Sequence, residues 1–195
     1  MIFNQLFDDK SSTYTYIISS GKGREALIID PVIEHTKKYI KILKDLELKL
    51  VKVIDTHIHA DHISGLNELN KQTECTRVMG EESESEVIDL RVKESEKVKI
   101  EGVELITLYT PGHTKCSYSY LMNDRVFTGD TLLINGSGRT DFQGGSAMEQ
   151  YDSIFNKLLK LPDKTLVYPA HDYNGKKFST VENERNNNPR LQVSS

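Results

Sequence analysis

Three histidines and one aspartate lie within the six residues His57-Ile58-His59-Ala60-Asp61-His62. Imidazole nitrogens and carboxylate oxygens are donors that proteins use to bind zinc, iron and other transition metals. The apolar run 50–54 before them predicts a β-strand, and side chains two apart at the end of a strand point to the same side. Asp61 and His62 follow in the turn that enters the next predicted helix. This segment therefore predicts four metal-binding side chains around one point.

Three more candidate ligands follow other predicted strands. His113, Asp130 and His171 each come just after an apolar run. Ligands at the ends of several strands meet at one edge of a sheet, which is how a rigid scaffold holds a metal. The seven groups could hold two metals bridged by Asp130 and activate water, so ligand types alone favour a dinuclear zinc hydrolase. The remaining histidine, His35, begins a predicted helix and is expected to be solvated.

The strands that must position these ligands form two groups, each accompanied by helices. Seven apolar or β-branched runs predict strands, at residues 14–18, 26–30, 50–54, 104–109, 117–122, 125–128 and 165–169. Helical spacing predicts helices from about Thr36, over 65–70 and over 147–160. The last is predicted to face the core with Met148, Tyr151, Ile154, Phe155, Leu158 and Leu159. The pattern favours an α+β fold, an αββα sandwich of two mixed β-sheets flanked by helices.

Length and composition exclude several classes of protein. The 195 residues suit one domain spanning 1–195, and the net charge of −4 offers no basic face for nucleic acid. Cys75 and Cys116 make no disulfide framework and are expected to be buried thiols. The acidic stretch 81–86 is expected to be solvated. The start of the chain has no basic leader, and no apolar run approaches the roughly 20 residues that span a bilayer. We therefore expect a cytoplasmic protein that binds neither nucleic acid nor membrane.

The order of the ligands resembles that of the metallo-β-lactamase superfamily, in which His-x-His-x-Asp-His is followed by a later His, Asp and His. Residues 127–143 and 168–191 resemble the persulfide dioxygenases, also called sulfur dioxygenases, which are the mononuclear iron branch of that superfamily. Ser117-Tyr118-Ser119 resembles a bacterial subgroup. Glyoxalase II is similar through Gly-Asp and Gly-Arg but diverges at Thr140-Asp141-Phe142-Gln143, and it carries a C-terminal helical domain.

The resemblance implies a metallo-β-lactamase fold and an enzyme that oxidises the sulfane sulfur of a persulfide, usually glutathione persulfide, with O2 to sulfite and free thiol in sulfide metabolism. Its cofactor would be one Fe(II) per chain, held by His57, His113 and Asp130 as catalytic ligands. Two histidines and one carboxylate suit Fe(II) because they leave positions open. The resemblance implies that the other four candidates orient ligands and bound water, although from the residues alone they could also hold a second metal: His59, Asp61, His62 and His171.

Four residues are candidates for binding the substrate. Arg139 is the best partner for a carrier carboxylate, although an ion pair with Asp141 is its alternative role. Tyr173 and Lys176 could add a hydroxyl and a charge, and solvent exposure is the alternative for Lys176. Thr114 follows a ligand directly and would support it, which packing alone would also explain.

Two alternatives and two departures accompany this interpretation. The main alternative function is a hydroxyacylglutathione thioesterase of the glyoxalase II type with a dinuclear zinc site. The other alternative is a non-enzymatic metal sensor.

The chain departs from the family pattern at Ser137, where some relatives have cysteine. It also stops soon after Leu191, where relatives continue into a final helix, so we expect the sequence to be truncated. The sequence does not fix the oligomeric state, and a homodimer is suggested only by the resemblance, since relatives are commonly dimers. A secreted β-lactamase is disfavoured because the chain has no leader.

Overall fold

Two six-stranded β-sheets form the centre of the molecule. The structure is a computed structural model and describes residues 1–142 and 144–192. The strand order of the first sheet is β1-β2-β3-β4-β5-β6, with antiparallel pairs from β1 to β3 and parallel pairs from β3 to β6. Its strands are β1 (Ile2–Asp8), β2 (Thr13–Ser19), β3 (Glu25–Ile29), β4 (Lys49–Ile54), β5 (Thr76–Gly80) and β6 (Leu90–Val92).

The second sheet has the order β12-β11-β10-β9-β8-β7 and is also mixed. Only β10 and β11 pair in parallel, and the other pairs are antiparallel. Its strands are β7 (Lys97–Ile100), β8 (Val103–Tyr109), β9 (Tyr118–Leu121), β10 (Arg125–Gly129), β11 (Leu166–Pro169) and β12 (Ser179–Thr180).

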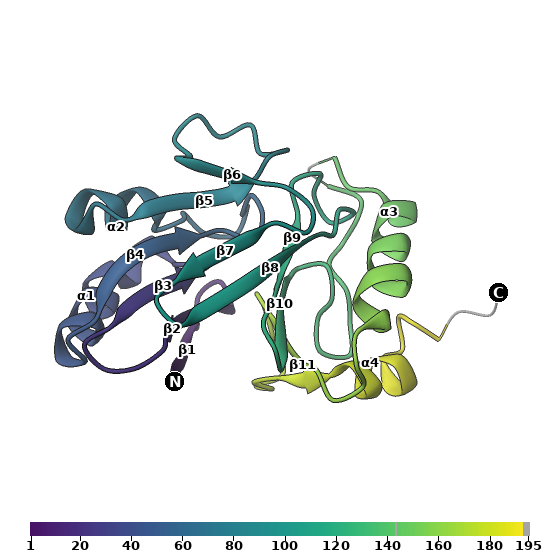
Figure 1. Ribbon diagram of the computed structural model, residues 1–195. Helices are drawn as coiled ribbons and strands as arrows, with labels where there is room; N and C mark the ends of the chain where they lie inside the picture. The colour runs from purple at the N-terminus through teal and green to yellow at the C-terminus, as the bar shows by residue number, and fades with distance from the viewer. Residues whose placement is uncertain (143, 193–195) are drawn as a thin grey trace.

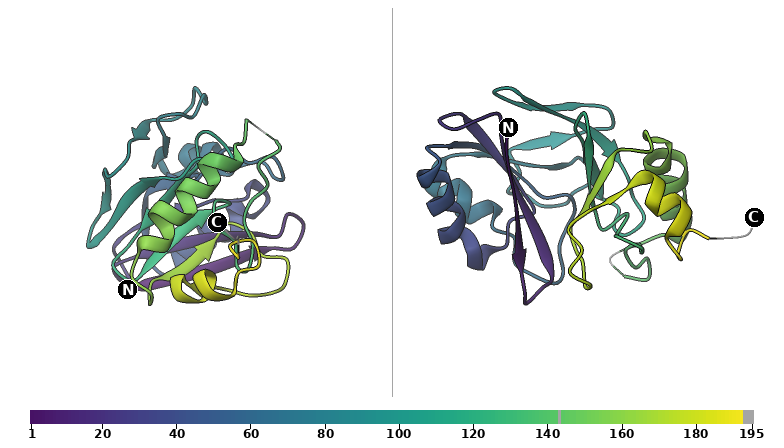
Figure 2. Two further views of the ribbon diagram at one scale, coloured as in Figure 1. Left: turned by 90° about the vertical axis from the view of Figure 1, so that its right-hand side faces the viewer. Right: turned by 90° about the horizontal axis from the view of Figure 1, so that it is seen from below.

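Helices cover the outer face of each sheet (Figure 1). The view from below shows α1 and α2 on one side, the two sheets between, and α3 and α4 on the other side (Figure 2). The helical segments are η1 (Ile33–His35), α1 (Thr36–Asp45), α2 (Leu66–Thr73), α3 (Ala147–Asp152), η2 (Ser153–Lys157), η3 (Leu158–Lys160) and α4 (Val181–Asn187). The predicted αββα sandwich is confirmed. Among the described residues, no helix combines the length and the apolar character needed to cross a membrane.

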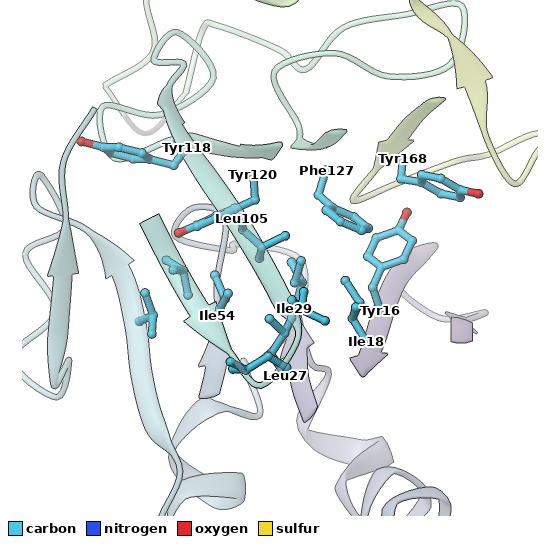
Figure 3. Close-up of a cluster of buried hydrophobic side chains, with 14 of the residues drawn as sticks. Tyr16, Ile18, Leu27, Ile29, Ile54, Leu105, Tyr118, Tyr120, Phe127 and Tyr168 are labelled. Atoms are coloured by element: carbon cyan, nitrogen blue, oxygen red, sulfur yellow. The ribbon is translucent and has the colours of Figure 1, made fainter. Parts of the chain in front are cut away.

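The core between the sheets is built from alternate side chains of facing strands, several of them aromatic (Figure 3). The ring of Tyr16 on β2 lies 4.9 Å from that of Phe127 on β10 and 5.7 Å from that of Tyr168 on β11, measured between centroids. Aromatic pairs at such distances add about 0.5–1.5 kcal/mol each beyond area burial. This packing fixes the strands whose ends carry the candidate ligands.

Three details of the sequence prediction are corrected. The helical run 147–160 exists, but its apolar residues do not all face the core: 83% of Met148 and 51% of Tyr151 is exposed. The run passes from α-helix to π-helix to 3-10 helix, so the turn per residue changes along it. In the acidic stretch, Ser83 is buried although the rest of the loop is mostly exposed. Cys75 and Cys116 are both free and buried, as expected.

His35 is the other correction, because it is not merely solvated. Its Nε2 atom lies 2.8 Å from Oδ1 of the buried Asp8. Burial alone would raise the pKa of Asp8, but hydrogen bonds from Ser11 and His35 lower it to about 2. His35 therefore ties the start of α1 to the end of β1.

Candidate metal centre

The candidate ligands gather at one edge of the two sheets, where the strands that carry them end. His57 and His59 follow β4, and His113 follows β8. Asp130 follows β10, and His171 follows β11. These residues are far apart in sequence, but the packing of the core brings the strand ends together. The structure therefore brings these side chains together at one edge.

One carboxylate oxygen lies between three imidazoles. Oδ2 of Asp130 is 3.9 Å from Nε2 of His57, 3.6 Å from Nε2 of His113 and 3.6 Å from Nε2 of His171. The side chain of His57 is almost fully buried, and that of Asp130 is 13% exposed. His57, His113 and Asp130 offer ligand atoms that all lie within 4.8 Å of one another, which suits a single metal ion.

The second ring nitrogen of each of two imidazoles is fixed by a backbone carbonyl. Nδ1 of His113 donates to the carbonyl oxygen of Arg139 at 2.8 Å, and Nδ1 of His171 donates to that of Ser12 at 3.2 Å. A carbonyl only accepts, so the proton must be on Nδ1 and the lone pair on Nε2. Both lone pairs thus face Asp130, as a metal would require.

Asp30 fixes the other two rings. It accepts from the hydroxyl of Thr56 at 3.0 Å, and that hydroxyl lies 2.8 Å from Nδ1 of His57. Since the Thr56 proton goes to Asp30, the Thr56 oxygen accepts from His57, whose Nε2 is left with its lone pair. Nε2 of His59 lies 3.3 Å from Oδ1 of Asp30. His59 is therefore turned the opposite way, so Nδ1 is the nitrogen that could bind a metal once the ring has lost its extra proton.

A second group of possible ligands adjoins the first. His59, Asp61 and His62 also bring ligand atoms within 4.8 Å of one another. Nδ1 of His62 lies 2.9 Å from Oδ2 of Asp61, which is 3.7 Å from Nε2 of His171. This group could hold a second cation, the alternative that the ligand types alone left open.

The donor atoms fit a metal. Within residues 1–142 and 144–192, Nδ1 of His59, Nε2 of His62 and Oδ1 of Asp130 are buried and have no hydrogen-bond partner. Buried polar atoms are almost always paired, because an unpaired one costs about 1–3 kcal/mol. Three such atoms in one place, all of types that ligate metals, are explained if a cation or its bound water contacts them.

Burial and charge shift the pKa values around this centre. Burial lowers the pKa of His57 well below its usual value, and the neighbouring histidines lower it further, which keeps this ring neutral. Burial alone would lower the pKa of His59, but the hydrogen bond and charge of Asp30 raise it to about 9. Burial raises the pKa of Asp55, also near His59, to about 7. Burial opposes ionisation of Asp61, yet His62 and His171 hold its pKa far below the ordinary value.

A pocket of about 380 Å³ opens over the metal centre. Its volume lies at the lower end of the range for small-molecule sites, about 300–1,000 Å³. Arg139 and Tyr173, both predicted from sequence, line this pocket, whereas Thr114 and Lys176 do not. The lining also includes residues that the sequence did not single out for the substrate: Ala60, Leu133, Ser137, Gly138 and Phe142.

Comparisons with known proteins show the family of the chain. Residues 8–98 and 84–171 match the metallo-β-lactamase superfamily. The mitochondrial persulfide dioxygenase ETHE1 of Mus musculus is 43% identical over 201 residues, which cover 100% of this chain and 77% of the relative. The crystal structure of ETHE1 from Myxococcus xanthus superposes with a TM-score of 0.97 at 45% identity, covering 100% of this chain and 86% of that one. The chain belongs to the persulfide dioxygenase family.

Other members of the superfamily are less similar to this persulfide dioxygenase. A hydroxyacylglutathione hydrolase of Dictyostelium discoideum is 34% identical over 187 residues, covering 89% of this chain and 68% of the relative. Membership of the dioxygenase family makes the chain an oxidoreductase. Gln143, which contributes to the Thr140-Asp141-Phe142-Gln143 resemblance, lies outside the described residues.

Two predicted substrate residues of the persulfide dioxygenase flank the pocket mouth. Arg139 Nε and Nη2 lie 2.7 Å and 3.0 Å from the two carboxylate oxygens of Asp141, so the alternative predicted for Arg139 is present. Its guanidinium also lies 5.6 Å from the ring centre of Phe142. The ring of Tyr173 stacks on that of His171, with centroids 6.2 Å apart and planes 5° apart.

Thr114 and Lys176 do not line the pocket of this persulfide dioxygenase. Thr114 is 1% exposed, and its hydroxyl lies 2.8 Å from that of Ser117. This contact favours the supporting role for Thr114 over substrate contact. Lys176 is exposed, and its backbone N–H donates to Asp172 at 2.7 Å. Its placement agrees with the solvent-exposed alternative.

Replacing Gly138 with alanine is expected to weaken metal binding by the persulfide dioxygenase. A Cβ at this position would lie 2.1 Å from the backbone carbonyl oxygen of Asp130 and 3.0 Å from Nδ1 of His113, so the backbone at Asp130 and the ring of His113 must shift. We expect an affinity for Fe(II) at least about 10-fold weaker, the lower end for groups that orient ligands. Anaerobic competition with a chelator measures it.

The matched control is Gly136→Ala. Its Cβ would meet only the side chain of Leu133, at an ordinary contact distance of 3.7 Å. Wild-type affinity in both variants would show that the loop at Gly138 does not hold the ligands in place.

Proposed function

We propose that the chain oxidises the sulfane sulfur of glutathione persulfide with O2, using one Fe(II) held by His57, His113 and Asp130. The observation that carries this proposal is the single carboxylate oxygen of Asp130 facing Nε2 of both histidines at 3.9 Å and 3.6 Å, beneath an open pocket. Two histidines and one carboxylate leave positions free for substrate and oxygen, which is characteristic of non-haem Fe(II) sites. Membership of the persulfide dioxygenase family supports the reaction.

The reaction balances without another reductant. Persulfide, O2 and water give free thiol, sulfite and two protons, and the four electrons lost by the sulfane sulfur reduce one O2. Fe(II), when bound, would supply the one-electron chemistry that lets O2 react with the sulfur. The sequence contains no Gly-x-Gly-x-x-Gly motif for a nucleotide cofactor.

The remaining polar groups orient the ligands and water. The Asp30–Thr56 pair holds the ring of His57, and the carbonyl of Arg139 holds that of His113. Nε2 of His171, 3.6 Å from Oδ2 of Asp130, is placed to bind water on the pocket floor. Groups of this kind commonly change metal affinity or activity by about 10–100-fold.

Arg139 is proposed to bind a carboxylate of the carrier thiol. Asp141 occupies the side of the guanidinium that carries Nε, which leaves Nη1 for a second carboxylate. Tyr173 lines the same pocket and is 71% exposed, so its side chain is accessible to the substrate.

Arg139→Ala is expected to raise KM for glutathione persulfide several-fold, roughly the effect of an exposed ion pair of about 1 kcal/mol. The value of kcat and the iron content should change little, because the side chain does not touch the ligands. Lys176→Ala is the control, since it removes a cation outside the pocket. Equal KM values in both variants and the wild type would assign Arg139 to a structural role.

A dinuclear zinc thioesterase is the second candidate function, because His59, Asp61 and His62 could hold another cation. Oxygen uptake by anaerobically iron-loaded protein separates the two functions. We expect uptake with glutathione persulfide and no hydrolysis of S-lactoylglutathione. Hydrolysis of the thioester without persulfide-dependent uptake would replace the proposal with the thioesterase.

A further inference from the structure

Helix α3 contacts the turns that carry two proposed iron ligands. It lies against the outer face of the second sheet (Figure 1). The backbone N–H of Ser146, at the start of the helix, donates to the carbonyl of Gly112 at 2.8 Å. The hydroxyl of Ser153 donates to the carbonyl of Pro111 at 2.7 Å. These bonds fix the turn that precedes His113.

Gln150 contacts both ligand turns. A Cβ at Gly112 would lie 2.3 Å from the backbone N and Cα of Gln150, so the chain beside His113 packs directly on this residue. Gly112 also has φ of +134°, a conformation that favours glycine. A side chain at position 112 would separate the turn from the helix.

The side-chain amide of Gln150 reaches the other turn. Its Nε2 donates to the carbonyl of Thr131 at 2.7 Å and lies 3.5 Å and 3.4 Å from the carbonyl oxygens of Asp130 and Gly138. Only 5% of Gln150 is exposed, so these contacts are shielded from water. Hydrogen bonds in such a setting are stronger and hold geometry more rigidly than exposed ones.

We propose that Gln150 is a positioning residue that sets the separation between His113 and Asp130 through its contacts with both turns. The inference rests on the proposed assignment of these two residues as iron ligands. Gln150 touches neither metal nor substrate and acts through the backbone of the two turns. Its loss should widen the site and weaken binding of the metal more than binding of the substrate.

Gln150→Met tests this, because methionine keeps the length of the side chain and removes the donor. We expect Fe(II) to bind about 10-fold more weakly by anaerobic chelator competition, the scale for groups behind metal ligands. The visible spectrum of the Co(II)-loaded protein should shift, and kcat should fall more than KM changes. Met148→Ala, on the exposed side of α3, should match the wild type in every measurement.

A lower Tm for Gln150→Met with unchanged Fe(II) affinity, Co(II) spectrum and kcat would overturn the inference, since general destabilisation leaves the affinity of the folded protein unchanged. Failure of the proposed function is separate: in that case Asp130→Ala would keep its iron, or the wild type would not take up oxygen with persulfide.

Discussion

Asp130→Ala is expected to remove bound iron and reduce persulfide-dependent oxygen uptake by more than about 100-fold. Even groups that only orient ligands cost about 10–100-fold, so loss of the carboxylate itself should cost more. Its Oδ2 lies between Nε2 of His57, His113 and His171, and alanine would remove the anionic donor that these nitrogens surround. Metal analysis and an oxygen electrode measure the two effects on the same sample.

Asp124→Ala is the control for this change. Asp124 precedes β10, is mostly exposed and pairs with Arg125 at 2.7 Å, away from the pocket. It should keep its iron and its turnover. Full iron and normal turnover in Asp130→Ala would disprove the ligand assignment.

His113→Ala and His62→Ala are expected to differ strongly. His113 belongs to the group with His57 and Asp130, whereas His62 belongs to the group with His59 and Asp61. Loss of His113 should abolish iron binding and reduce turnover by more than about 100-fold, for the reason given for Asp130. Loss of His62 should leave one iron per chain and reduce turnover by about 10-fold, the lower end for a group that orients ligands.

The dinuclear alternative predicts a different outcome for the same pair. His62→Ala would then lose one of two metals together with most of the activity, because both ions would activate the water. Metal per chain, determined for both variants in parallel with the wild type, distinguishes the two arrangements. Two metals in the wild type and one inactive metal in His62→Ala would refute the single-iron site.

The position of the candidate site could be predicted from the sequence because its signal is local. His57 and His59 follow an apolar run, and His113, Asp130 and His171 each follow another, so strand ends were the natural place for them. Which donors face which cation could not be predicted. The answer depends on how each imidazole ring is oriented. The ring of His59, for example, is oriented by Asp30, a residue far from it in sequence.

Strand prediction succeeded for seven apolar or β-branched runs, but it missed β1 and β5 as well as the shorter or more charged β6, β7 and β12. The three-residue strand β6 is too short to show alternation. Strand β7 does alternate, with Val98 and Ile100 buried between exposed lysines, so its period of two could have been recognised.

Gln150 was missed although the sequence carried a signal for it. It stands four residues before the buried Ile154, so helical spacing puts a polar side chain on the inward face. A buried amide requires partners, but that these are the carbonyls of a ligand turn becomes visible only in three dimensions. The spacing of apolar residues in the sequence likewise does not predict the change to a π-helix after Asp152.

Anaerobic titration of metal-free protein with Fe(II), followed by persulfide-dependent oxygen uptake at each point, tests the central claim most directly. If His57, His113 and Asp130 hold the catalytic metal alone, uptake should rise in proportion to iron and stop rising at one iron per chain. Activity that appears only as a second metal binds, or that zinc supports equally well, would contradict the account.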